Sequence, residues 1–204
     1  MTLEQVSFYA NIASFVAVVS IWIILVWILR SRKQSGPVPH ASNSKRSWLG
    51  FALQFLSFAV LGIGSRFRMP LFSPLFEGQF AVNIILQATA IILIILAVAL
   101  DLSAFRELGK QWSLQARVLE GHELITTGVY SAVRHPIYTA LLAQLIATGI
   151  VFSNWISICA AVILFLIGTR IRTVNEERLL KKAFGSEFDA WKKNVPGLIP
   201  ILRR

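Results

Sequence analysis

Charged residues are scarce in this sequence. Only 15% of its 204 residues are Asp, Glu, Lys or Arg, whereas 55% are hydrophobic, and the mean hydropathy is +0.65. A soluble domain of this size could not bury so much apolar surface. The composition therefore excludes an ordinary soluble globular protein and indicates an integral membrane protein. The length fits one domain, so we expect residues 1–204 to form a single membrane domain.

Cysteine and acidic residues are also few. Cys159 is the only cysteine, which excludes an internal disulfide and a cysteine-based zinc site, and we expect no metal. Ten acidic residues stand against 20 basic ones, which gives a net charge of +10. No basic stripe interleaved with stacking aromatics lies outside the apolar runs, so we expect no nucleic-acid partner. The basic residues are expected to set the topology and to contact the lipid bilayer.

Long apolar runs divide the chain into membrane spans. A helix needs about 20 apolar residues to cross the ~30 Å hydrocarbon core of a bilayer. The last two runs are shorter, and only Ser153-Asn154 separates them, which predicts a tight helical hairpin. The expected spans are Phe8–Leu29, Trp48–Gly64, Phe80–Leu100, Ile137–Phe152 and Trp155–Gly168.

The remaining segments are expected to connect and follow these spans. Residues 34–47 and 65–79 read as loops, and 101–136 as a long polar segment. Residues 173–192 have an amphipathic helical pattern, and 195–200 are expected to form an extended tail. The predicted fold is an all-α integral membrane protein with about five transmembrane helices and a C-terminal cytoplasmic amphipathic helix.

The distribution of Lys and Arg predicts the orientation in the membrane. Eighteen of the 20 fall in the 30–47 and 101–136 segments and in the region from Arg170 to the end, and only two fall in the 65–79 loop. Cytoplasmic loops carry an excess of Lys and Arg. The bias predicts five spans with the N-terminus outside and the C-terminus in the cytoplasm, which fits a prokaryotic inner membrane.

Two polar clusters flank the predicted hairpin. The first is Gly128-Val-Tyr-Ser-Ala-Val-Arg-His-Pro-Ile-Tyr138, and the second is Glu176-Glu177. A hairpin returns the chain to the interface from which it started, so both clusters are expected on the same side of the bilayer. This arrangement indicates a site at the membrane surface.

Several of these residues also have a purely structural interpretation. His135 precedes Pro136 at a helix start, where the missing N–H of proline costs nothing, and it can cap backbone groups there. Tyr138 can belong to an interfacial aromatic belt. The pair Glu176-Glu177 suits the first turn of an ordinary solvated helix. The site hypothesis competes with these interpretations.

The arginines that follow the fifth span are similarly ambiguous. Arg170 and Arg172 can act as stop-transfer residues whose charged ends reach the interface. Arg172 also lies four residues before Glu176, so a simple ion pair on one helix face is possible. Either arginine can instead bind an anionic group.

A set of short motifs follows this part of the chain in a fixed order. The motifs are Leu108-Gly109 with Trp112-Ser113, Gly128-x-Tyr130, Arg134-His135-Pro136-x-Tyr138, Ser153-Asn154-Trp155, Arg172-x-x-x-Glu176-Glu177, Phe184-Gly185-x-Glu187-Phe188 and Val195-Pro196-x-Leu198-Ile199-Pro200. Each is weak alone, but the ordered set covers nearly half the chain. It resembles the isoprenylcysteine carboxyl methyltransferase and phospholipid methyltransferase superfamily of integral membrane enzymes.

The resemblance implies a methyltransferase that uses S-adenosylmethionine and releases S-adenosylhomocysteine. Residues 101–204 would form the cofactor-binding core with the hairpin, and residues 1–100 the three N-terminal spans. A lipophilic acceptor would enter from the bilayer between helices. The expected cofactor-binding residues are Leu124, Gly128, Tyr130, Arg134, His135, Pro136, Tyr138, Glu176 and Glu177. Arg172 is expected to hold an acceptor carboxylate, with Arg170 as the other candidate.

The chemistry of a sulfonium donor fits these residue types. Its methyl group is already activated, so the enzyme mainly aligns the reactants and excludes water. Glu176 or Glu177 can accept hydrogen bonds from the donor's ammonium and hydroxyl groups. Arg134 or His135 can bind its carboxylate at the positive end of a helix.

Other functions remain open from the sequence. By resemblance, the nearest acceptor is the carboxylate of a protein S-isoprenylcysteine, and the reaction is its O-methylation. A phospholipid amine, a quinone-like phenol or a small thiol are alternative acceptors. A related bundle serves NADPH-dependent sterol reductases, although the Glu-Glu pair disfavours that activity. A non-enzymatic scaffold or transporter component is the third alternative. Val129, Phe188 and Trp191 depart from residues common in the superfamily, and the oligomeric state is not specified.

Overall fold

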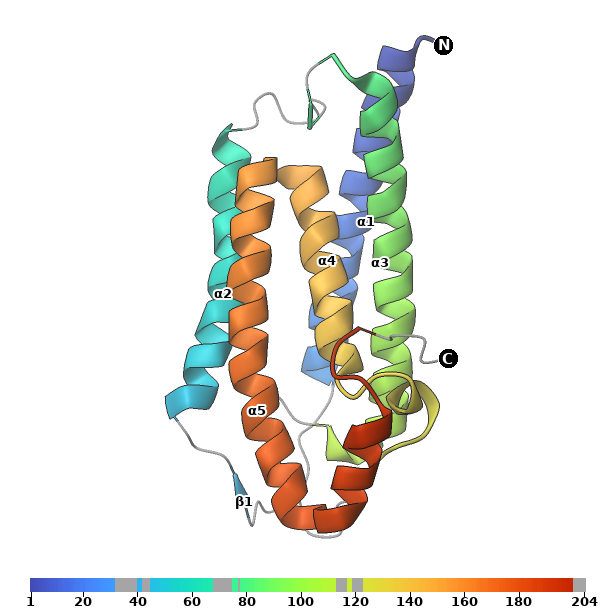
Figure 1. Ribbon diagram of the computed structural model, residues 1–204. Coiled ribbons are helices and arrows are strands. Elements are labelled where there is room, and N and C mark those ends of the chain that lie inside the picture. The colour runs from blue at the N-terminus through green and yellow to red at the C-terminus, as the bar shows by residue number, and fades with distance from the viewer. Residues whose placement is uncertain are drawn as a thin grey trace.

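Five helices form the bundle in this computed structural model, which describes residues 1–31, 40–41, 45–67, 75–76, 78–112, 117–118 and 123–199. The helices alternate in direction, so that their ends gather at two opposite faces (Figure 1). They are α1 (Leu3–Ser31), α2 (Lys45–Gly64), α3 (Phe80–Leu108), α4 (Pro136–Phe152) and α5 (Trp155–Asn194). The predicted all-α fold with five helices is confirmed.

Short elements complete the described part of the chain. Single 3₁₀ turns are η1 (Ser65–Phe67), η2 (Gly109–Gln111) and η3 (Gly128–Ser131). A two-residue antiparallel ladder joins β1 (His40–Ala41) to β2 (Arg117–Val118). Of the residues expected as loops, 34–47 and 65–79, most lie outside the described residues, and residues 45–47 belong to α2.

Length and apolarity make four of the helices candidate membrane spans. They are α1, α2, α3 and α5, whereas α4 is a shorter apolar helix of 17 residues. Side chains on the outer surface of the bundle are apolar and exposed, for example Phe55, Ile85 and Ile163. An exposed apolar belt of this kind suits a lipid environment, so the protein is an integral membrane protein.

The α4–α5 hairpin forms as the sequence predicts. Pro136 occupies the first turn of α4. Asn154 caps α5, because its side chain accepts a hydrogen bond from the Ser157 amide at 3.0 Å, and its Nδ2 donates to the Gly64 carbonyl at 3.1 Å. The hairpin tip is thereby attached to the end of α2. The start of α4 and the lower half of α5 consequently lie at the same end of the bundle (Figure 1).

Two boundaries differ from the prediction. α3 continues to Leu108, so the start of the expected polar segment is helical. From hydropathy, Asp101 was expected to mark the end of a span. It is instead buried within α3, where one carboxylate oxygen accepts a hydrogen bond from Gln144 Nε2 of α4 at 2.8 Å. The fifth span and the amphipathic helix form one helix, which kinks at Gly185 with φ of +53°.

Buried polar contacts fasten α1 to α3. Asn83 donates to Ser7 Oγ at 2.7 Å and to Asn11 Oδ1 at 3.2 Å, and Ser14 donates to Gln87 Oε1 at 2.5 Å. Interhelical hydrogen bonds of this type stabilise helix association in a bilayer. The polar residues of the first span thus contact another helix and do not mark a path through the membrane.

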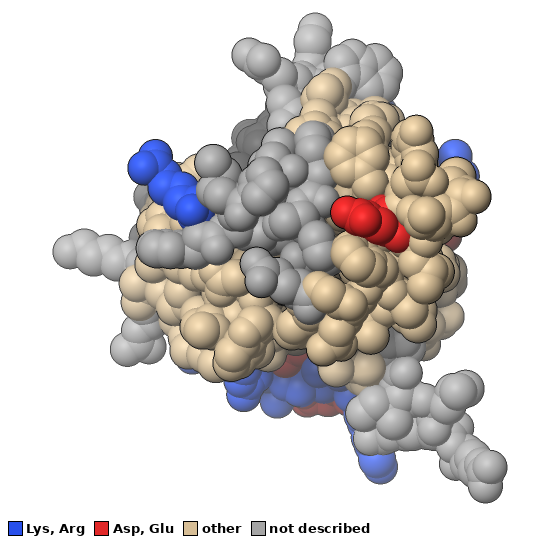
Figure 2. Space-filling view, turned by 90° about the horizontal axis from the view of Figure 1, so that it is seen from above, with Lys and Arg blue, Asp and Glu red and all other residues tan. Residues whose placement is uncertain are grey.

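The two ends of the bundle differ in charge. The end formed by the start of α1 and the end of α2 exposes mainly uncharged side chains among the described residues (Figure 2). The lower half of α5 at the opposite end carries exposed basic residues, including Arg178, Lys181 and Lys182. The candidate site lies at this second, charged end.

Candidate active site

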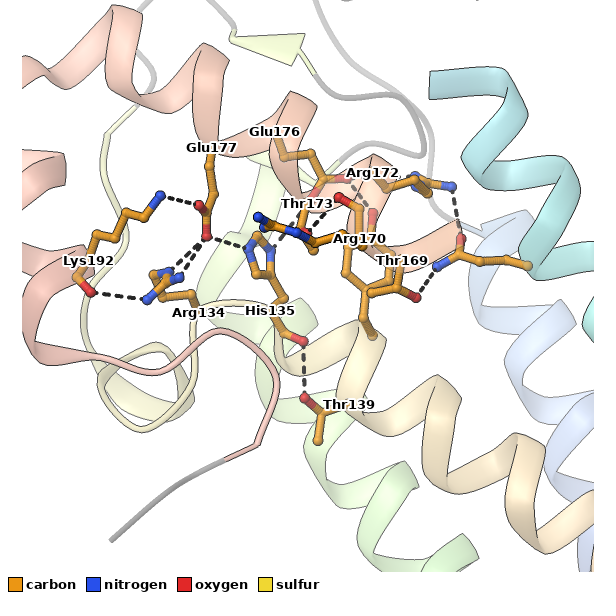
Figure 3. A network of polar contacts seen from close by, with 12 residues as sticks. Arg134, His135, Thr139, Thr169, Arg170, Arg172, Thr173, Glu176, Glu177 and Lys192 are labelled. Carbon is orange, nitrogen blue, oxygen red and sulfur yellow. Dashed lines mark hydrogen bonds and ion pairs between the residues drawn. The ribbon is translucent and has the colours of Figure 1, made fainter. Parts of the chain in front are cut away.

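Arg134 and Glu177 join the two polar clusters of the hairpin. Both Nε and Nη2 of Arg134 donate to Glu177 Oε1, at 3.0 and 2.8 Å (Figure 3). Arg134 lies in the turn before α4, and Glu177 projects from the lower half of α5. The structure therefore brings the motifs at opposite ends of the hairpin into direct contact, as the sequence predicts.

Glu177 is surrounded by positive groups. Besides Arg134, it accepts from Lys192 Nζ at 2.6 Å and contacts His135 Nε2 at 3.2 Å. Burial acts to raise the pKa of the Glu177 carboxyl, but the hydrogen bonds from His135, Lys192 and Arg134 outweigh it and hold the pKa well below its usual range. With groups from Arg134, His135 and Lys192 directed at it, Glu177 links three side chains of the site.

Glu176 is more loosely held than its neighbour. The Tyr138 hydroxyl donates to Glu176 Oε1. The nearest cationic nitrogens are His135 Nδ1 at 3.6 Å and Arg172 Nη2 at 3.8 Å, and the side chain is 22% exposed. This carboxylate can therefore accept hydrogen bonds from a cationic or hydroxyl-bearing ligand without first breaking a tight ion pair.

His135 lies between the two carboxylates. Burial acts to lower its pKa, but hydrogen bonds from the ring to Glu176 and Glu177 and the attraction of their charges raise the pKa above the ordinary 6.5. The raised pKa extends the pH range over which the ring is an imidazolium, the form in which both nitrogens donate.

Arg170 and Arg172 occupy different environments. Arg170 is exposed, and its carbonyl accepts from Thr173 Oγ1 at 3.2 Å. The side chain of Arg172 is only 8% exposed. Its guanidinium carbon lies 5.4 Å from the ring centres of both Phe51 of α2 and Tyr138 of α4. Of the two arginines expected to bind the acceptor, only Arg172 points into the site.

The C-terminal tail covers the Arg134 side of the site. Arg134 Nη1 donates to the Lys192 carbonyl at 3.1 Å and also to the Val195 carbonyl. The amides of Arg134 and His135 donate to the carbonyls of Pro196 and Gly197 at 2.9 and 3.0 Å. Arg134 is thus occupied by Glu177 and the tail.

The other expected site residues surround this network. Gly128 has φ of +55°, and a Cβ there would lie 2.2 Å from Glu107 Oε1, so glycine is required at this turn. Tyr130 is buried, and its carbonyl accepts from Trp191 Nε1 at 3.1 Å. Leu124 is partly buried in the segment that leads into η3. Pro136 is buried at the start of α4.

Two contributors to the site were missed by sequence reasoning. Lys192 contacts Glu177 across the kinked end of α5, and Gln54 of α2 contacts Arg172 Nη1 at 3.5 Å. Lys192 follows the Phe184-Gly185 motif. The kink at Gly185 turns the end of α5 back toward Glu177, so this motif was a sequence signal for the contact. Gln54 lies in a span without any motif, and no pattern marks it.

Several ligands can be tested against these groups. Glu176 supplies an incompletely paired carboxylate, and the buried Nδ2 of Asn175 donates to no described partner. The guanidinium of Arg172 is suited to a carboxylate. Among the described residues, no group of three or more His, Cys, Asp and Glu side chains could hold a metal ion. The site can therefore bind a zwitterionic ligand and a second, anionic group beside it.

The fold and site define an all-α integral membrane protein with a polar site at one end of its helices. Residues 90–182 match the family described as isoprenylcysteine carboxyl methyltransferase. The chain is 27% identical over 203 residues to protein-S-isoprenylcysteine O-methyltransferase of Schizosaccharomyces pombe. The aligned region covers 94% of this chain and 84% of that protein. The chain is thus similar to the isoprenylcysteine carboxyl methyltransferase family, and these similarities support a membrane methyltransferase.

Further relatives match over shorter stretches. Protein-S-isoprenylcysteine O-methyltransferase B of Arabidopsis thaliana is 30% identical over 54% of this chain and 57% of its own length. The Mus musculus protein-S-isoprenylcysteine O-methyltransferase is 30% identical over 58% of this chain and 42% of its own length. The chain thus spans only about half the length of these two relatives. The family match covers α4 and α5 as far as residue 182, including Glu177, and also Arg134 and His135, whereas Gln54 and Lys192 lie outside it.

Proposed function

We propose that this chain transfers the methyl group of S-adenosylmethionine to the carboxylate of a lipophilic acceptor of the S-prenylcysteine type. The observation that carries the proposal is the buried Arg172 guanidinium beside the partly exposed Glu176 carboxylate. The Arg172 guanidinium suits an anionic acceptor, and the Glu176 carboxylate suits a cationic donor. Both residues lie where the apolar part of α5 ends. The names of the relatives support an isoprenylcysteine acceptor.

Donor binding is assigned to the less occupied groups of the site. Glu176 accepts hydrogen bonds from the donor's ammonium or ribose hydroxyls, because Glu177 is already paired with three cations. The imidazolium of His135 faces Glu176 and adds the positive group that the donor's carboxylate needs. Arg134 fixes His135 through Glu177 and the tail. Tyr130 and Tyr138 contribute apolar surface.

The transfer itself needs no acid, base or metal. An oxygen of the acceptor carboxylate attacks the methyl carbon, the carbon–sulfur bond breaks, and its electron pair returns to sulfur. The products are a methyl ester and neutral S-adenosylhomocysteine, so no proton moves. Arg172 orients the carboxylate in line with the carbon–sulfur bond, and this orientation is the main catalytic contribution of the protein.

The charge asymmetry supports a membrane orientation. The chain places 18 of its 20 Lys and Arg residues in the 30–47 and 101–136 segments and from residue 170 onward, and described members of these segments, such as Arg134 and Lys192, lie at the end of the bundle that carries the site. By the positive-inside rule this end faces the cytoplasm and the N-terminus lies outside. A prokaryotic inner membrane is the proposed location. The soluble donor then reaches the site from the cytoplasm, and the acceptor reaches it from the bilayer.

Calorimetric titration of the detergent-purified protein tests the donor assignment. Wild type is expected to bind S-adenosylmethionine and S-adenosylhomocysteine with micromolar affinity. Glu176→Gln and His135→Ala are expected to lose at least tenfold in affinity, which corresponds to about 1.4 kcal/mol. If folded wild type bound neither compound, with or without added lipid, the methyltransferase mechanism at this site would be wrong, and NADPH would be titrated next.

A further inference from the structure

Gln54 is a buried polar residue in α2, a helix that lies outside the family match and carries no motif. Its side chain is 7% exposed, and its helix neighbours from Trp48 to Leu56 are apolar residues and one glycine. A buried amide without hydrogen bonds is costly, particularly in a membrane. The hydrogen-bond partners of Gln54 therefore indicate its role in the protein.

The Gln54 amide connects Thr169 to Arg172. Its Nε2 donates to Thr169 Oγ1 at 2.8 Å, and its Oε1 accepts from Arg172 Nη1 at 3.5 Å. A guanidinium has donors only, so the amide must present its oxygen to Arg172 and its nitrogen to Thr169. Thr169 is fully buried on the same helix as Arg172 (Figure 3). The orientation of the amide is thus fixed from both sides.

Close helix packing brings Gln54 to this position. A Cβ on Gly50 would lie 2.7 Å from Arg172 Cγ and 2.8 Å from the Gly168 carbonyl oxygen. A Cβ on Gly168 would lie 2.7 Å from the Gly50 carbonyl oxygen. Small residues allow helices in a membrane to approach closely. The α2–α5 crossing consequently lies directly beside the arginine and places α2 side chains against it.

Charge explains why a neutral amide suits this position. Arg172 contacts the Phe51 and Tyr138 rings, and Glu176 Oε1 lies 3.8 Å from its Nη2. When the donor's ammonium binds Glu176, the attraction between Glu176 and Arg172 becomes weaker. Gln54 still holds Nη1 after this change, and it leaves the guanidinium charge available for an anion. A carboxylate at position 54 would neutralise the same charge.

We propose that Gln54 is a positioning residue that aligns Arg172 for the carboxylate of the methyl acceptor. The inference rests on the proposed function and assigns α2 a part in acceptor binding. Phe51 and Tyr138 limit the tilt of the guanidinium, and Gln54 fixes its rotation. Glutamine is required because its amide accepts a hydrogen bond without adding charge.

The test compares binding of an N-acetyl-S-farnesylcysteine carboxylate with binding of its carboxamide to the detergent-purified full chain, in the presence of S-adenosylhomocysteine. The ratio of the two affinities reports how well Arg172 meets the carboxylate. Wild type is expected to prefer the carboxylate at least tenfold. Gln54→Met, which conserves volume, and Gln54→Glu, which adds charge, are expected to lose most of this preference. Their affinity for S-adenosylhomocysteine should stay within about twofold of wild type.

Controls separate positioning from general damage. Gln87→Met removes another buried glutamine, which bonds Ser14 far from Arg172, and should keep the carboxylate preference. Thr169→Val leaves Gln54 in place but frees its amide, and it is expected to reduce the preference by a smaller factor. Thr169→Val also serves if the Gln54 variants do not fold.

The outcomes distinguish the inference from the proposed function. Loss of the preference in the Gln54 and Thr169 variants, with donor affinity retained, supports the inference. A wild-type preference in folded Gln54→Met, or in Thr169→Val, would overturn it and leave the proposed function intact. If wild type itself bound carboxylate and carboxamide equally, the acceptor role of Arg172 would fail, and the role of Gln54 with it.

Discussion

Arg170 and Arg172 lie two residues apart on α5, yet only Arg172 reaches the site. Arg172 lies buried against the rings of Phe51 and Tyr138, whereas Arg170 is exposed. Two residues correspond to about 200° around a helix of 3.6 residues per turn, so the side chains must point in different directions. The helix geometry thereby separates a buried arginine of the site from an exposed one.

This separation predicts unequal effects of conservative substitutions. Arg172→Lys is expected to lower kcat/KM for the acceptor by about 100-fold, because an ammonium cannot pair with a carboxylate through two parallel hydrogen bonds. Arg170→Lys is the matched control and should stay within about twofold of wild type. Initial rates with S-adenosylmethionine at saturation measure both. Equal losses in the two variants would contradict the assignment.

The two adjacent glutamates are predicted to differ in role. Glu177→Gln leaves Arg134, His135 and Lys192 without their common partner and should destabilise the protein by about 3 kcal/mol. Glu176→Gln removes only loose ion pairs and should change the thermal midpoint little while weakening donor binding at least tenfold. Thermal unfolding and calorimetry on both variants check this division. A larger loss of stability in Glu176→Gln would reverse the roles.

His135 predicts a definite pH dependence of stability. Its pKa in the folded protein is raised above 6.5, so its contribution is fully present below about pH 6.5 and declines as pH rises through the folded-state value. Glu177 has the opposite shift: its contribution is fully present above about pH 4.5 and is lost as the pH falls toward its much lower folded-state pKa. Between pH 6 and 9, wild type should therefore lose stability relative to His135→Gln. Thermal midpoints of both proteins across this range would show a parallel trend if the ring were neutral throughout.

The α2–α5 crossing predicts a sharp contrast between two glycines of one helix. Gly50→Ala places a methyl group 2.7 Å from Arg172 Cγ and should destabilise by about 1–3 kcal/mol while raising KM for the acceptor. Gly62→Ala meets nothing within 4 Å and should be neutral or up to about 1 kcal/mol stabilising. Thermal unfolding and acceptor kinetics on the pair test the contact. Similar behaviour of both variants would contradict the close crossing.

Much of the site was predictable because it lies on a hairpin. Ser153-Asn154 and Pro136 fix where the chain turns, and a hairpin necessarily returns Glu177 to the level of Arg134. The sequence could not assign separate roles to Glu176 and Glu177, since that difference depends on Lys192, which reaches back only because Gly185 kinks α5.

Other features depended on contacts that hydropathy cannot represent. Asp101 was expected to begin a polar segment, but its hydrogen bond with Gln144 allows α3 to continue past it. Gln54 carried no sequence signal, because its role arises from the packing of Gly50 against Gly168, residues more than 100 positions apart. Local pattern thus predicted the elements, whereas the partners of buried polar groups required the three-dimensional arrangement.

The most direct test of the central claim is the formation of a base-labile methyl ester. Purified wild type would be incubated with S-adenosylmethionine labelled in its methyl group and with N-acetyl-S-farnesylcysteine, and the product would then be treated with alkali. Carboxylate methylation predicts labelled methanol released by the alkali, with the signal reduced about 100-fold in Arg172→Lys. A base-stable label in this compound would contradict carboxylate methylation, because its other nucleophilic atoms belong to an amide and a thioether. Absence of any labelled product from protein that binds the donor would contradict a prenylcysteine acceptor.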